Sequence, residues 1–103
     1  MSWEIQADVD KIVYTHSEES YVSRNIYRKS REVRHEPSAE YKAPDDDIME
    51  DVYAAESEHG EFKWSVTARR EGFETYAEIE DVEIIQSPRD CEFEDPSFSI
   101  KQM

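Results

Sequence analysis

Apolar and polar residues alternate with a period of two over residues 3–14. One face carries Trp3, Ile5, Ala7, Val9 and Val13, and the other carries Glu4, Gln6, Asp8 and Asp10. Successive side chains of a β-strand point to opposite faces, so this pattern predicts a half-buried strand.

Residues 17–35 carry a pattern that fits two kinds of element. Val22, Ile26 and Val33 form a helical stripe, and glutamates at the start with arginines towards the end suit a helix macrodipole. The serines and the asparagine of this stretch are poor interior helix residues, and its tyrosines fit a strand almost as well. We favour a helix ended by Pro37, with a strand as the alternative.

A loop and a second helix are predicted next. Residues 36–44 contain two prolines and are typical of a loop. A helix is then expected to open at Pro44 and to stop at Gly60, with acidic residues in its first turn. Its apolar stripe comprises Ile48, Met49, Val52, Tyr53 and Ala55.

The last third of the chain predicts strands. A hairpin is expected from the alternation of Phe62, Trp64, Val66 and Ala68, a turn at residues 70–72, and a return through Phe73, Thr75, Ala77 and Ile79. The alternation changes phase near Glu80 and Asp81, which predicts a β-bulge. One or two short final strands are expected around Pro96, at Cys91/Phe93 and Phe98/Ile100.

These elements together predict an α+β fold. We expect one domain, residues 1–103, in which a small antiparallel sheet of about four to five strands packs with one or two helices. The chain has no Leu but has six Tyr and two Trp. Each buried aromatic side chain removes about 150–250 Å² from water, so a thin, aromatic-rich core is expected.

Charge is distributed unevenly along the chain. There are 26 acidic and 12 basic residues, a net charge of −14. Residues 24–35 sum to +4 (five basic, one acidic), and residues 36–103 sum to −14 (six basic, 20 acidic). Such an excess opposes compaction, so it usually serves solubility, steering or a basic partner. It also disfavours direct binding to nucleic acid.

The sequence predicts a cytoplasmic protein without membrane contact. The longest apolar run is Val52–Ala55, far short of the ~20 residues that a membrane helix needs. The opening residues do not have the pattern of a signal peptide.

No group of residues predicts catalysis, a metal or a cofactor. The acids of residues 45–51 lack the glycine at the sixth position that an EF-hand loop requires. His16, His35, His59 and Cys91 are too scattered for a zinc motif. We therefore expect a non-enzymatic protein with no metal and no cofactor.

The predicted return strand carries the best candidate for a partner-binding surface. Residues two apart on one face of a strand lie ~6.6–6.8 Å apart, roughly the separation of phosphates along a nucleic-acid strand. The predicted contacts are Glu74, Glu78, Glu80, Asp81 and Glu83, with an exposed Tyr76, or alternatively Tyr41, as a hot spot. A second predicted patch comprises Asp46, Asp47, Glu50 and Asp51. The alternative is an ordinary solvated acidic face.

A basic cluster precedes the acidic part of the chain and comprises Arg24, Arg28, Lys29, Arg31 and Arg34. It could compensate acids within the chain, pair with the acidic face of a second copy to form a homo-oligomer, or contact phosphate. Compensation is the default expectation, with each exposed pair contributing about 0–1 kcal/mol.

The function that this pattern favours is inhibition of a basic nucleic-acid-processing enzyme or toxin by mimicry of nucleic-acid phosphates. Anti-restriction, anti-CRISPR and nuclease-immunity proteins act in this way, and the analogy rests on size and charge alone. The alternative is a structural or assembly accessory subunit of a larger complex, whose acidity serves only solubility. Adaptation to a high-salt habitat is a third, weaker possibility.

Overall fold

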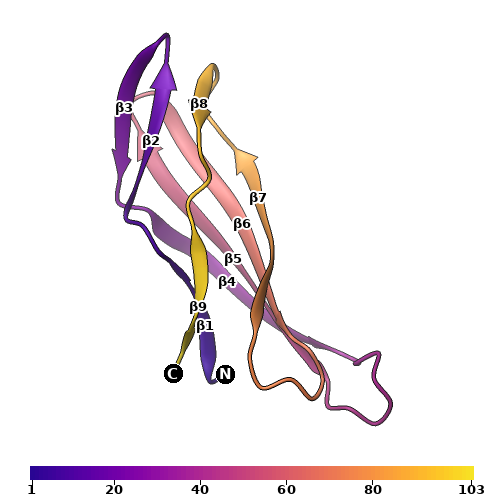
Figure 1. Ribbon diagram of the computed structural model, residues 1–103. Helices are drawn as coiled ribbons and strands as arrows, with labels where there is room; N and C mark the ends of the chain where they lie inside the picture. Colours follow the sequence, from indigo (N-terminus) through magenta and orange to yellow (C-terminus); the bar gives the residue numbers. More distant parts are fainter.

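Strands make up 65% of the chain, and the computed structural model, which describes all 103 residues, contains no helix (Figure 1). The nine strands are β1 (Trp3–Ala7), β2 (Lys11–His16), β3 (Glu19–Arg24), β4 (Tyr27–Glu36), β5 (Asp46–Ser57), β6 (Gly60–Arg70), β7 (Glu78–Gln86), β8 (Cys91–Phe93) and β9 (Phe98–Gln102). The predicted α+β fold is therefore wrong, and the fold is all-β. The structure has no helix that could cross a membrane.

The strands form three antiparallel sheets that face one another in two layers (Figure 1). The order β4-β5-β6-β7 makes the large sheet, and the smaller sheets have the orders β3-β2-β8 and β1-β9. The two smaller sheets lie end to end along one face of the large sheet. The molecule is elongated, measuring 55 × 23 × 18 Å.

The core lies between these layers in two adjoining clusters. At the β1–β9 end, Trp3 and Ile5 pack on Met49, Tyr53 and the middle of β6. At the other end, the cluster comprises Ile12, Tyr14, Ala55, Phe62 and Trp64. The prediction of an aromatic-rich core is correct, because the largest fully buried side chains include both tryptophans.

The helix predicted from Pro44 to Gly60 is instead β5, a central strand of the large sheet. Its inner face carries Met49, Asp51, Tyr53 and Ala55, which pair with β6 residues whose side chains are buried. Its outer face carries Ile48 and Ala54, which are also fully buried. With apolar residues on both faces, the strand shows no simple alternation, and Gly60 starts β6 rather than stopping a helix.

The helix favoured for residues 17–35 is also wrong, since the segment forms β3 and most of β4. Ser17 and Glu18 both have positive φ, 50° and 68°, and they connect β2 to β3 as a two-residue hairpin turn. Asn25 (φ 65°) lies between β3 and β4. The strand alternative was the correct one.

The remaining strand predictions agree with the structure in part. The alternation over residues 3–14 breaks at Asp8–Asp10, and its phase changes so that Val13 is exposed. The β6–β7 pairing is confirmed, but β7 begins at Glu78 and not at Phe73. The predicted bulge is confirmed, because the β6–β7 register shifts between Thr67 and Ala68. The two short final strands are confirmed as β8 and β9, and the loop predicted at residues 36–44 is found at residues 37–45.

Candidate functional site

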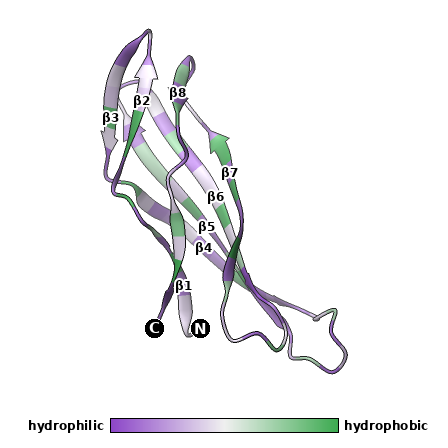
Figure 2. Cartoon of the chain, in the orientation of Figure 1, coloured by the Kyte–Doolittle hydropathy of each residue, from purple (hydrophilic) through white to green (hydrophobic).

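A row of exposed acids follows β7, which is a free edge of the large sheet. Glu78, Asp81 and Glu83 lie opposite Arg69, Thr67 and Ser65 of β6, positions that alternate with the buried residues of that strand. The row therefore lies on the outer face of the large sheet, the face turned away from the two smaller sheets. Figure 2 shows β7 hydrophilic where it begins and hydrophobic where it ends.

Glu80 joins the same row because of the bulge. Ile79 pairs with Ala68 and Asp81 pairs with Thr67, so Glu80 is the extra residue of β7. Its carboxylate lies 3.4 Å from Arg69 Nε on the outer face. We define the acidic row as Glu78, Glu80, Asp81 and Glu83.

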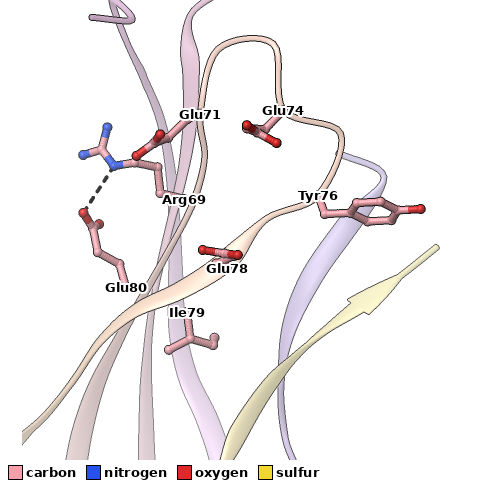
Figure 3. A pocket seen from close by; sticks show the side chains of 7 residues that line it. All are labelled: Arg69, Glu71, Glu74, Tyr76, Glu78, Ile79 and Glu80. Carbon is pink, nitrogen blue, oxygen red and sulfur yellow. Dashed lines mark ion pairs between the residues drawn. The ribbon is translucent and has the colours of Figure 1, made fainter.

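An open groove of about 370 Å³ lies where the acidic row meets the loop of residues 71–77 (Figure 3). The residues that line it are Arg69, Glu71, Glu74, Tyr76, Glu78, Ile79 and Glu80. The structure thus brings together four of the residues predicted to contact a partner, namely Glu74, Tyr76, Glu78 and Glu80. Sequence reasoning missed Glu71, because it placed this residue in the turn of the hairpin.

Arg69 is the only cation that lines this groove. Its guanidinium contacts Asp46 at 2.8 Å, Glu36 at 3.3 Å and Glu80 at 3.4 Å. The hydrogen bond to Asp46, above all, raises the pKa of Arg69. One positive charge shared by three carboxylates leaves the groove with Glu71, Glu74 and Glu78 uncompensated, so its potential is negative.

The loop that carries Glu71 and Glu74 is fixed by two anchors from β5 and β6. The Gly72 N–H donates to Asp46 Oδ1 at 2.7 Å, and this bond lowers the pKa of Asp46. Arg70 Nη1 donates to the Gly72 carbonyl at 2.6 Å and to the Glu74 carbonyl at 3.0 Å. The acidic side chains therefore project from a held backbone.

The second predicted patch is engaged within the molecule. Asp51 is fully buried, and Asp46 is buried beside Arg69. Asp47 contacts Arg70 Nε at 2.8 Å and His35 Nδ1 at 2.7 Å, and Glu50 lies 3.2 Å from Arg34 Nη1. These four acids do not lie together on an open surface; they position basic side chains.

The basic cluster is largely compensated within the chain. Lys29 pairs with Glu61 at 3.4 Å, Arg31 pairs with Asp51 and Glu4, and Arg34 pairs with Glu50 and Glu36. Arg24 and Arg28 make no ion pair.

A second group of chemically active side chains lies at the opposite end of the molecule. The His16 and His59 rings stack with centroids 4.0 Å apart, and Tyr14 Oη lies 2.8 Å from His59 Nδ1. Cys91 lies opposite His16 in the antiparallel pairing of β2 with β8. Burial raises the pKa of the Cys91 thiol. No three His, Cys, Asp or Glu side chains in the structure converge as a metal site.

Comparison of the chain with protein-family models, with curated proteins and with solved structures gives no match.

Proposed function

We propose that this chain is a non-enzymatic acidic binding protein that inhibits a basic nucleic-acid-processing enzyme or toxin by mimicking nucleic-acid phosphates. The observation that carries the proposal is the acidic row on the free edge of the large sheet, continued by Glu71 and Glu74 in the groove. Of these six carboxylates, only Glu80 has an ion-pair partner.

The spacing of the row supports mimicry. Asp81 and Glu83 are two apart on one face of β7, a separation of ~6.6–6.8 Å. This is close to the distance between neighbouring phosphates along one nucleic-acid strand. The bulge keeps Glu80 on the same face, which makes the row denser than simple alternation allows.

The overall charge density supports it as well. A net charge of −14 along a 55 Å axis gives one negative charge per about 4 Å. One strand of duplex DNA carries one charge per ~3.4 Å of helix axis. The linear charge density that this molecule would offer to a basic groove of its partner is therefore similar to that of a single nucleic-acid strand.

The mechanism has two steps. The negative field steers the protein to the positive surface where the partner binds nucleic acid, which accelerates association. Once bound, the carboxylates of the acidic row take the places of phosphates, and the nucleic acid is excluded. No cofactor or chemical step is needed, and we place this activity in the cytoplasm.

The test is capture of partners from lysate, compared across three versions of the protein. Wild type is compared with E78Q/D81N/E83Q and with the control E18Q/E92Q/E94Q, which removes the same charge from exposed, unpaired sites elsewhere. We expect wild type and control to retain nucleic-acid enzymes that a DNA duplex or high salt displaces, and the row variant to lose them. Retention that is indifferent to salt and to DNA would contradict mimicry.

A role as an assembly subunit remains the second candidate, and one observation favours it. Val13 and Val22 are paired across β2 and β3 with exposed side chains, beside the exposed Val9. Paired apolar side chains facing water are typical of a contact surface. This role predicts a defined oligomer by light scattering at every salt concentration, and V13S/V22S should dissociate it; a strict monomer would count against it.

A further inference from the structure

Three aromatic side chains project into solvent at one end of the molecule. Tyr41 is 84% exposed, Phe73 65% and Tyr76 68%. They belong to the loops of residues 37–45 and 71–77, which lie side by side beyond the ends of β4–β7 (Figure 1). We call these three residues the aromatic tip. Exposed aromatic side chains gathered at one place usually mark a binding surface.

Contacts between the two loops fix the backbone that carries the aromatic tip before any partner binds. A Cβ on Gly72 would lie 2.7 Å from Ser38 Oγ and 3.0 Å from Ala43 Cβ, which shows how closely the loops approach. Arg70 Nη2 donates to the Asp45 carbonyl of the first loop at 3.1 Å, while Nη1 of the same guanidinium holds the second loop. Preorganised loops lose little entropy on binding.

Carboxylates surround the aromatic tip. Glu40 and Asp45 lie on the first loop and Glu71 and Glu74 on the second, all exposed and without ion pairs. In Figure 3 the Tyr76 ring points outward, away from the glutamates of the groove. Tyr76 nevertheless lines the same groove as Glu71, Glu74 and Glu78, so a ring and several carboxylates border one surface.

One ring already holds a cation. Lys42 Nζ lies 5.3 Å from the centroid of the Tyr41 ring, within the range of a cation–π contact. The contact shows that a cationic side chain can approach the face of a ring at the tip.

We propose that the aromatic tip selects arginine side chains on the basic partner, in preference to lysine. The inference rests on the proposed function and adds the chemistry of the contact. A guanidinium is planar and weakly hydrated, so it stacks on aromatic rings and also pairs with a carboxylate through two hydrogen bonds. An ammonium group is compact and strongly hydrated, and it gains less from a ring face. A surface that combines rings and carboxylates is therefore selective for arginine.

The experiment uses two peptide probes of equal charge, labelled nona-arginine and nona-lysine, titrated with the protein at low salt and followed by fluorescence anisotropy. We expect nona-arginine to bind about five- to tenfold tighter, as two or three exposed cation–π contacts would give. Y41A/F73A/Y76A should bind both peptides alike, while Y41F/Y76F, which keeps the rings, should retain the preference. The matched control Y27A/I85A, at exposed sites at the opposite end of the large sheet, should behave as wild type.

The outcomes separate this inference from the proposed function. Equal, salt-sensitive binding of both peptides by wild type would overturn arginine selection and leave charge mimicry standing. An arginine preference that survives in Y41A/F73A/Y76A would also overturn it, because the selectivity would then lie elsewhere. Failure to bind either peptide would contradict both proposals. Because the three rings are exposed, unchanged melting temperatures of the variants will show that binding effects are not due to unfolding.

Discussion

Arg31 donates two hydrogen bonds of 2.8 Å to the buried carboxylate of Asp51, from Nε to Oδ1 and from Nη2 to Oδ2. The same guanidinium donates to Glu4 Oε2 at 2.9 Å and to the Ile5 carbonyl at 3.0 Å. One side chain of β4 thereby ties β5 of the large sheet to β1 of the opposite layer. Compensation within the chain, the default expectation for this basic cluster, is confirmed at Arg31, whose partner Asp51 is fully buried.

Removal of one member of this pair should be strongly destabilising. D51N leaves Arg31 without its main partner, and we expect a loss of about 3 kcal/mol in the free energy of unfolding, the lower end of the range for broken buried pairs because Arg31 keeps some contact with solvent. Urea unfolding followed by tryptophan fluorescence measures it. The double variant R31M/D51L removes both charges and should be more stable than D51N. If D51N unfolds at the same urea concentration as wild type, the Arg31–Asp51 ion pair contributes nothing to stability.

Substitution by alanine should destabilise the protein at one phenylalanine, Phe62, and leave its stability unchanged at another, Phe73. Phe62 is fully buried, stacks on Trp64 and meets the edge of Phe93, so F62A should cost about 3–5 kcal/mol. Phe73 is exposed at the aromatic tip, so F73A should leave the melting temperature unchanged. Thermal unfolding of the pair checks this, and a large loss for F73A would mean that the tip packs more tightly than the structure shows.

Stability should fall in acid partly because of Asp46. The Gly72 N–H and Arg69 hold its pKa below the ordinary value of 3.8 in the folded protein. A carboxyl with a depressed folded-state pKa stabilises above its unfolded pKa, and this contribution is lost as the pH falls through the folded value. Melting temperatures from pH 7 to pH 2 should therefore drop steeply below about pH 4 in wild type. D46N should have a lower melting temperature than wild type at pH 7, and its melting temperature should fall less steeply below about pH 4. If the melting temperatures of the two proteins fall in parallel, Asp46 does not have this role.

Neutralising the acidic row should stabilise the protein while it weakens binding. Glu78, Asp81 and Glu83 repel one another and add to a net charge of −14, so E78Q/D81N/E83Q should melt higher than wild type at low salt. The difference should shrink in high salt, where the repulsion is screened. Calorimetry at both salt concentrations tests this. A lower melting temperature for the variant would mean that the row makes stabilising contacts.

The strands of the C-terminal part could be predicted because each turns one face towards the core, fully buried in β6 and partly buried in β7, β8 and β9. Phe62, Trp64, Val66 and Ala68 alternate without a break, and every one of them is fully buried on the inner face. The bulge at Glu80 left its own signal, since an extra residue changes the phase of the apolar positions. A period of two survives in the sequence wherever one face meets the core and the other meets water.

The helix wrongly predicted for β5 has a physical cause in the ion pair between Arg31 and Asp51. Asp51 occupies a core position between Met49 and Tyr53, where an apolar residue would have completed the alternation. Its charge is tolerated only because Arg31, distant in sequence, pairs with it. Together with the buried Ile48 and Ala54 on the other face, this produced a pattern that fits a helix.

The β2–β3 hairpin could not be predicted because its turn residues are unusual. Two-residue turns with positive φ at both positions normally use Asn, Asp or Gly, whereas this one uses Ser17 and Glu18. Without that signal, Val22, Ile26 and Val33 remained as an apparent helical stripe. The acidic row could be predicted from its spacing, but the groove could not, because Arg69, Glu71 and Tyr76 meet only through the folded loop.

The pairing of β1 with β9 sets the order in which the chain can mature. Trp3 lies opposite Gln102, and the Met103 N–H donates to the Ser2 carbonyl at 2.8 Å. During translation at about 5–20 residues per second, the first strand is synthesised roughly 5–20 seconds before its partner. Throughout that interval Trp3 and Ile5 have no ninth strand to complete their layer. The negative charge that opposes association of nascent copies also arrives late, because residues 36–103 carry the whole net charge of −14.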